Sequence, residues 1–150
     1  MTDELRTARL LLRRWSKDDR KPFAGMNADP EVMRFFPAPL TREQSDALVD
    51  RIEAHFEDHG FGLWALEARG NFAGFTGIQW TVLDHLDSEL EVGWRLARWA
   101  WGHGWATEAG RCCPATWPGR GRAGRQRHSS AQPGFLAGHA TPGHDIRARV

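Results

Sequence analysis

The stretch EVGWRL, residues 91–96, followed by WGHGWATEA, residues 101–109, decides the fold of this chain. The first part has the character of a strand, and the second that of a turn entering a helix. Gly102 and Gly104 stand in that turn, where the lack of a Cβ lets the backbone approach a ligand. The free N–H groups and positive dipole end of a helix's first turn attract anions. The stretch therefore predicts a phosphate or pyrophosphate site, although the same residues also suit a turn that only connects two elements.

Upstream of this stretch, turn residues and apolar periodicity divide the chain into strands and helices. Thr41 and Gln44 predict a capping box for a helix that Gly60 ends. Gly74 and Gly77, inside an aromatic-rich strand, indicate a bulge or a close backbone approach. The predicted helices run from Ser16 to Met26, from Asp29-Pro30 to before Pro37, and from Thr41 to His59 with Leu48, Ile52 and Phe56 on one face. The predicted strands span residues 9–15, 61–68, 72–80 and 88–96.

Composition favours a soluble protein with a real core. The chain has 150 residues, a net charge of +1 and 41% hydrophobic residues. We find no apolar run long enough for a membrane helix and no apolar signal region at the N-terminus. Its two cysteines, Cys112 and Cys113, are adjacent, which suggests neither a disulfide framework nor a zinc site. We therefore expect a cytoplasmic protein with no membrane partner, no specific nucleic-acid partner and no metal.

The same stretch resembles the acetyl-CoA-binding motif of the GNAT acetyltransferase superfamily. Residues 91–109 are most similar to the branch that acetylates the N-termini of ribosomal proteins, with Trp105 in the place of a tyrosine. Residues 7–15, TARLLLRRW, resemble the opening of the same branch. Trp99 departs from the superfamily pattern, which often has Gln or Arg there. The resemblance implies an α+β fold with a mixed, mostly antiparallel sheet flanked by helices.

The chain changes character after residue 110. From Arg111 onward it has one acidic residue, Asp145, against seven arginines, and Gly, Pro, Ser and His dominate. Such a segment buries too little apolar surface to offset its ordering entropy. We therefore divide the chain into a GNAT-like domain, residues 1–110, and a basic tail, residues 111–150, that is disordered or out of frame. The last strands of the fold would then be missing, and the bare edge beside residues 91–96 would favour a homodimer.

A shifted reading frame explains the tail. Each residue fixes most of its codon, so the codons of residues 132–144 can be read one base later. The shifted codons permit N-x-x-S-x-x-V-M-x-R-L-G-M, which resembles the C-terminal signature of the same branch. We therefore hypothesise a frameshift near Arg111, either a true mutation or an error in the underlying DNA sequence.

The resemblance implies transfer of an acetyl group from acetyl-CoA to a primary amine, on a protein N-terminus or a small molecule. Glu91 would act as general base, since it shares a strand with Gly93, whose N–H would stabilise the developing oxyanion. Gly93 is also a candidate position for a bulge. No general acid is assigned, because the tyrosine expected for that role is absent from the sequence. The cofactor-binding residues are predicted to be Trp94, Arg95, Leu96, Gly102, His103, Gly104, Trp105, Ala106 and Thr107.

Several roles and two other functions remain open at this level. Glu89 and Glu108 are weaker candidates for the base, and Glu91 is equally suited to a structural salt bridge. Arg95, Arg98 and His103 suit either the outer phosphates or a solvated surface. The chain as a whole also suits a truncated, inactive acetyltransferase-like protein, or a binding module whose basic tail contacts nucleic acid through its charge.

Overall fold

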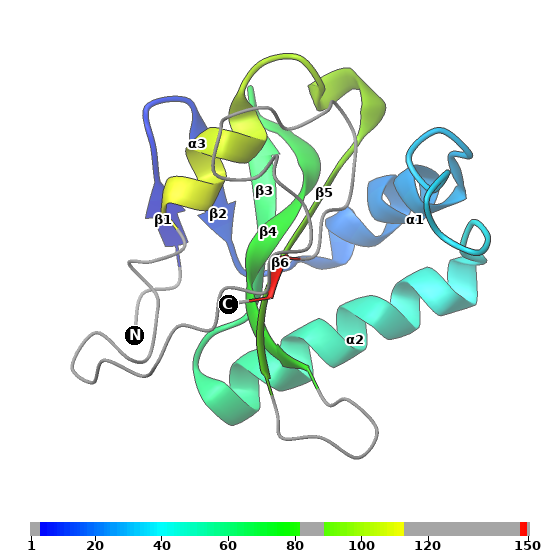
Figure 1. Cartoon of the computed structure of the whole chain (residues 1–150), viewed down its shortest axis with the longest axis horizontal. Helices are drawn as coiled ribbons and strands as arrows, with labels where there is room; N and C mark the ends of the chain where they lie inside the picture. The colour runs from blue at the N-terminus through cyan, green and yellow to red at the C-terminus, as the bar shows by residue number, and fades with distance from the viewer. Residues whose placement is uncertain (1–3, 82–88, 113–147, 150) are drawn as a thin grey trace.

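The computed structural model describes residues 4–81, 89–112 and 148–149. One sheet forms the centre, with α1 and α2 on one face and α3 on the other (Figure 1). The strands pair in chain order: β1 (Glu4–Arg6), β2 (Leu10–Arg13), β3 (Leu63–Ala68), β4 (Asn71–Thr81), β5 (Glu89–Leu96) and β6 (Ala148–Arg149). The helices are η1 (Lys17–Asp19), α1 (Arg20–Ala28), α2 (Arg42–His59), η2 (Arg98–Ala100) and α3 (Trp105–Cys112). The predicted α+β class is confirmed, and every pairing within the described ranges is antiparallel.

The long helix α2 begins and ends where its capping residues predict. The Thr41 hydroxyl accepts a hydrogen bond from the Gln44 N–H at 3.2 Å, and the Gln44 carboxamide oxygen accepts one from the Thr41 N–H at 2.9 Å. Gly60 ends the helix in the left-handed conformation, with a φ of 76°. Ile52 and Phe56 are buried, as predicted, together with Val49, and Leu48 is half-buried against the same core.

The region around α1 differs from the prediction. The backbone after Ser16 first makes the short helix η1, because the Asp19 carboxylate accepts a hydrogen bond from the Ser16 N–H at 2.7 Å. Ser16 is the N-cap, as predicted, but of η1, and α1 follows directly from Arg20. The short helix predicted from Asp29-Pro30 is wrong, because residues 30–38 form turns and bends. Strand β1 is also absent from the prediction, since three residues carry too short a pattern.

The hairpin between β3 and β4 explains the glycines inside its second strand. Arg69 and Gly70 form a two-residue turn, both with positive φ, which suits the twist of an antiparallel pair. Ala73 is the extra residue of a bulge, because Leu66 pairs with Gly74 while Glu67 pairs with Phe72. A Cβ on Gly74 would lie 2.0 Å from the Arg95 carbonyl oxygen, so β4 and β5 meet closely only because Gly74 is a glycine. The predicted bulge and close approach are therefore both confirmed.

A histidine on α2 holds the far end of β4. The Trp80 N–H donates to Nε2 of His55 at 3.0 Å, so that nitrogen must be unprotonated. Nδ1 therefore carries the proton and donates to the Phe61 carbonyl oxygen at 2.8 Å. Burial lowers the pKa of His55, and the neighbouring His59 lowers it further, while Asp58 opposes the shift. This hydrogen bond ties the end of β4, the strand that pairs with β5, to helix α2.

The outer edge of β5 is covered in part. Glu91 pairs with Arg149 and Val92 with Ala148, both in β6. This corrects, at these two positions, the expectation of a bare edge along residues 91–96. The predicted bulge at Gly93 does not occur against β4, because the register between the two strands is continuous from Glu89 to Leu96.

The remainder of the tail prediction, from Cys113 to Arg147, lies outside the described residues. In the described part of the chain, no helix combines the length and the apolar character needed to cross a bilayer.

Candidate functional site

Strand β5 carries candidate residues on both of its faces. Successive side chains of a strand alternate, so Glu91, Gly93 and Arg95 share one face. This face is the one covered by α1, because the Arg95 side chain reaches Asn27 on that helix. Trp94 and Leu96 occupy the opposite face and are 5% and 6% exposed. The predicted base and the two apolar cofactor residues are therefore on one strand but face opposite ways.

Glu91 is buried near the middle of the sheet, with a relative exposure of 6%. It pairs across the sheet with Gln79 of β4, in the segment fixed by His55. Gly93 follows two positions later, and a Cβ there would touch only Leu63 and Phe75, at 3.6 and 4.0 Å. The carboxylate suits a base, but the predicted oxyanion donor is engaged in the sheet: the Ala97 N–H donates to the Ala73 carbonyl oxygen, and the alternation from that bond directs the Gly93 N–H at Gly77 of β4.

The glycine turn lies at the opposite end of β5. Gly102 and Gly104 have φ values of 77° and 75°, a conformation that side chains rarely adopt. Gly104 accepts the first hydrogen bond of α3, from the Glu108 N–H at 3.1 Å, so the next N–H groups have no partner inside the helix. Those N–H groups belong to Trp105, Ala106 and Thr107, which are three of the predicted cofactor residues.

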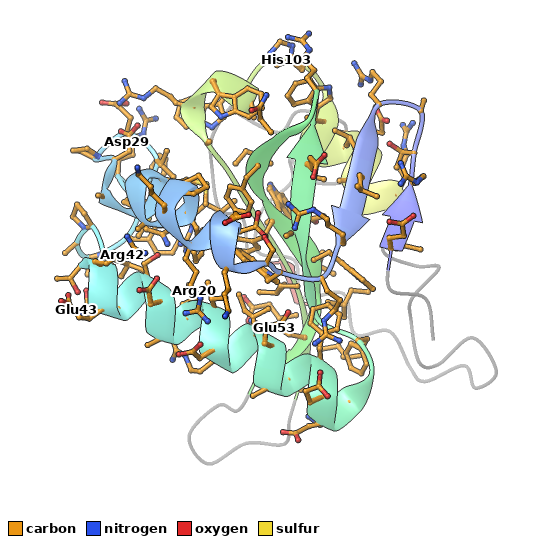
Figure 2. The ribbon with its side chains drawn as sticks, turned by 180° about the vertical axis from the view of Figure 1, so that it is seen from behind. Arg20, Asp29, Arg42, Glu43, Glu53 and His103 are labelled. Carbon is orange, nitrogen blue, oxygen red and sulfur yellow. The ribbon has the colours of Figure 1, made fainter. Side chains whose placement is uncertain are left out.

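The side chains of the turn form an aromatic group. His103 stacks on Trp105 with ring centroids 4.3 Å apart, and Trp99 meets the same ring edge-on at 5.8 Å. Trp105 is 3% exposed, so its ring is part of the core, with His103 stacked on it. The Trp105 indole N–H is buried and has no hydrogen-bond acceptor among the described residues. His103, labelled in Figure 2, remains half-exposed at this end of the sheet.

Two arginines predicted as phosphate ligands are engaged elsewhere. Arg95 is 4% exposed, donates to the Asn27 carboxamide oxygen at 2.6 Å and lies over the rings of Phe36 and Phe75. It is therefore part of the core beneath α1 and does not face the turn. Arg98 makes an ion pair with Asp29 at 2.6 Å and so ties η2 to the end of α1. Neither contact is visible in local sequence, because each joins residues almost 70 positions apart.

Glu108 has a structural role and is not placed to act as a base. It accepts hydrogen bonds from the Thr7 hydroxyl, from the Arg9 N–H at 3.0 Å and from Arg9 Nε at 2.6 Å. These donors, the Thr7 hydroxyl first, lower the pKa of Glu108 and keep it ionised. The contacts fasten α3 to the turn between β1 and β2.

Arg9 is the cation that sequence reasoning missed. Its Nη2 atom lies 3.7 Å from the position that a Cβ on Gly104 would take. Its Nε is held by Glu108, and its side chain is 53% exposed. The guanidinium is thus held beside the glycine turn by the contact of its Nε with Glu108. Among the described residues, no group of three or more His, Cys, Asp or Glu side chains is placed to hold a metal.

A family model for the acetyltransferase (GNAT) domain matches residues 9–125. The chain belongs to the GNAT acetyltransferase family. A solved structure from Bordetella pertussis, named as a GnaT-family acetyltransferase, superposes with a TM-score of 0.64 at 22% identity, over 76% of this chain and 71% of that one. That likeness confirms the predicted GNAT-like fold.

The chain is also similar to YkkB of Bacillus subtilis (strain 168). The two are 30% identical over 113 residues, which is 73% of this chain. The match spans 65% of the length of YkkB, so about a third of YkkB has no counterpart in the matched region. The family accounts for acyl transfer as the general chemistry, and the geometry described above bears on how this chain would perform it.

Proposed function

We propose that this protein transfers an acetyl group from acetyl-CoA to a primary amine, on a protein N-terminus or on a small molecule. The observation that carries the proposal is the layout of β5, which has a buried carboxylate near its middle and a glycine turn beyond its end. Leu96 lies five positions after Glu91, which is about 17 Å along a strand. That separation suits a ligand with a reactive group at one end and phosphates at the other.

The turn has the features that a pyrophosphate needs. Gly102 and Gly104 present backbone where no Cβ intervenes, and the first N–H groups of α3 point the same way. Arg9 adds a positive charge beside Gly104, and Glu108 holds it in place. Arg9 therefore takes the part that Arg95 and Arg98 were predicted to take. The pantetheine arm would then lie along β5, from Leu96 towards Gly93.

Acetyl-CoA supplies a thioester whose carbonyl carbon accepts the amine nitrogen. Glu91 removes a proton from the incoming ammonium, and the freed amine attacks that carbon. The Gly93 N–H expected for this oxygen is directed at Gly77 of β4, so the donor that stabilises the oxygen as it gains negative charge comes from elsewhere in the site. The carbon–sulfur bond then breaks, the acetyl group stays on the nitrogen, which gives up its second proton to become a neutral amide, and the thiolate leaves and takes up a proton. The sequence contains no tyrosine, so a different group or water supplies that proton.

Titration calorimetry with acetyl-CoA, followed by mass spectrometry over a panel of peptides and small amines, tests this proposal. Gly104→Glu should abolish binding, because it places a side chain and a negative charge where a pyrophosphate would sit. Glu91→Gln should leave acetyl-CoA affinity within twofold and lower kcat by about 100-fold or more, as loss of a general base does. Acetyl-CoA binding without acetylation of any amine would identify the chain as an inactive relative. Unchanged affinity in Gly104→Glu would refute the site.

For the domain boundaries, we propose that residues 1–110 are the acetyltransferase domain and that residues 111–150 come from a shifted reading frame. The compositional break at Arg111 and the shifted codons of residues 132–144 support this reading. Sequencing the coding DNA across codons 105–115 and 132–144 tests it. If the bases at codons 132–144 do not spell the C-terminal signature, the frameshift hypothesis is wrong.

A further inference from the structure

The last residues of β4 extend past the beginning of its neighbour β3, and they carry the register partner of the proposed base. The first residue of β3, Leu63, pairs with Gly77, so in the described part of the chain residues 78–81 pair with a strand on one side only. That strand is β5, in which Glu91 faces Gln79. The place of the proposed base therefore depends on a stretch of β4 that lies beyond the reach of β3.

The main-chain groups of this stretch alternate between the two sides. Counted from the hydrogen bond of the Ala97 N–H, the main-chain groups of Gln79 face Glu91. The even-numbered residues of β4 face the β3 side, where the Ile78 N–H donates to the Gly62 carbonyl oxygen at 3.3 Å. The next N–H on that side lies two residues further along, and it needs an acceptor that is not part of a strand.

His55 of α2 supplies that acceptor. The Trp80 N–H donates to its Nε2 at 3.0 Å, and its Nδ1 donates to the Phe61 carbonyl oxygen at 2.8 Å. Helix α2 runs past this end of β4 (Figure 1), so the ring bridges the helix, the chain before β3 and the end of β4. Only the neutral ring makes both contacts, because a protonated Nε2 carries a hydrogen and cannot accept a hydrogen bond.

The surroundings keep the ring of His55 neutral near pH 7. Burial lowers its pKa most and His59 lowers it further, while the bond to Phe61 and the charge of Asp58 oppose the shift. Among the described residues, the titratable groups that act on the ring are these two, and both lie on α2. The chain before β3 and the end of β4 meet the ring through uncharged main-chain groups of Phe61 and Trp80.

We propose that His55 is a positioning residue for Glu91, a role that rests on the proposed function. Its neutral ring holds the main chain at Trp80, and the adjacent residue, Gln79, holds the main chain at Glu91. When His55 takes up a proton, Nε2 becomes a donor that faces another donor, the Trp80 N–H. The end of β4 then moves away from α2, and the register partner of Glu91 moves with it. Acid therefore slows the reaction by displacing the base as well as by protonating it.

The pH dependence of kcat, measured with the amine from the panel that is acetylated fastest, tests this role. Two groups must be deprotonated, so kcat should fall by more than about tenfold per pH unit on the acid side. His55→Gln places an uncharged amide that accepts the bond from Trp80 but does not titrate. This variant should keep kcat within about threefold at pH 8 and lose no more than about tenfold per pH unit. Far-UV circular dichroism identifies the pH values at which each protein is folded, and only these are compared.

His59→Gln is the matched control. His59 lies on the same helix and its ring contacts that of His55, but it makes no hydrogen bond to β4 among the described residues. The control should keep the steep loss of kcat in acid. An equally steep loss in His55→Gln overturns the positioning role, as does a shallow loss in both the unaltered protein and His59→Gln.

Amide NMR spectra of the unaltered protein test the same link without acetylation and without a variant that must fold. The backbone amides of Trp80, Gln79 and Glu91 should all shift with the midpoint of the His55 ring. A shift at Trp80 that does not extend to Gln79 and Glu91 overturns the link to the base. If all three amides shift but no amine is acetylated, the link stands and the proposed function fails. If an amine is acetylated but the amides do not follow His55, the function stands and the positioning role fails.

Discussion

Gly74→Ala is expected to separate β4 from β5 and to remove a large share of the stability of the protein. The new Cβ would lie 2.0 Å from the Arg95 carbonyl oxygen and 2.9 Å from the Leu96 Cα. Both are backbone atoms, so no side-chain rotation relieves the contact, and β5 itself must move. The φ of Gly74 is also 146°, which adds backbone strain for any residue with a side chain.

The loss of stability in Gly74→Ala has two contributions, the backbone strain and the steric overlap of the new Cβ. A residue in a sparsely populated backbone region costs about 1–3 kcal/mol. Forced overpacking with backbone movement costs about a further 1–3 kcal/mol. The sum, about 2–6 kcal/mol, compares with a total stability of about 5–15 kcal/mol for a small domain. We therefore expect a lower urea midpoint by tryptophan fluorescence, together with loss of acetyl-CoA binding, because β5 carries both ends of the site.

Two glycine variants are matched controls for this experiment. Gly110→Ala, in α3, has no atom within 4 Å of the new Cβ and should stabilise the protein by about 0.5–1 kcal/mol. Gly93→Ala touches only Leu63 and Phe75 at ordinary contact distances, so it should change stability by less than about 1 kcal/mol. A loss of less than about 1 kcal/mol in Gly74→Ala would refute the reasoning about the close approach.

The protein should lose stability as the pH falls below about 6.5, the ordinary pKa of a histidine. In this range the histidine of the unfolded chain takes up a proton, whereas the lowered pKa of His55 keeps it neutral in the folded protein. The loss is complete once the pH has fallen through the lowered pKa of His55. The difference between the urea midpoints at pH 8 and pH 5.5 should be smaller for His55→Gln than for the unaltered protein. An equal difference would contradict the neutral state assigned to His55. Glu108→Gln should lower the free energy of unfolding by about 1–3 kcal/mol, since it weakens charge-assisted hydrogen bonds from Arg9 and Thr7; no change in the urea midpoint would argue against that anchor. Arg9→Met should weaken acetyl-CoA binding by about tenfold at low salt and reduce its salt dependence, and calorimetry at two ionic strengths measures both.

Local patterns were sufficient wherever the cause of a structure is local. The Thr41 capping box, the apolar face of α2 and the helix end at Gly60 each depend on residues a few positions apart, and the structure confirms all three. The positive φ values of Gly102 and Gly104 agree with a glycine turn for the same reason. The Asp29-Pro30 helix failed although apolar residues follow its start signal: Val32 and Met33 pack into the core from a segment of turns and bends.

The charged residues of the site were harder to place. Arg95 was assigned to phosphate from its position on the strand, but strand alternation directs it towards α1 and Asn27. Arg9 was read only as the start of a strand, and its place beside Gly104 depends on how α3 packs. Opposite charges separated by many residues meet only in the folded chain, so no window of sequence identifies the pair.

The attachment of α3 to the beginning of the chain has a consequence for biosynthesis. The strands pair in the order in which they are made, so the sheet can grow from its N-terminal edge as the chain emerges from the ribosome. The hydrogen bonds from Thr7 and Arg9 to Glu108, however, span 101 and 99 positions. At translation rates of about 5–20 residues per second, the first hairpin waits about 5–20 s for this partner. During that interval the turn at Arg9 is open to chaperones and proteases, and the arrival of α3 closes it together with the glycine turn.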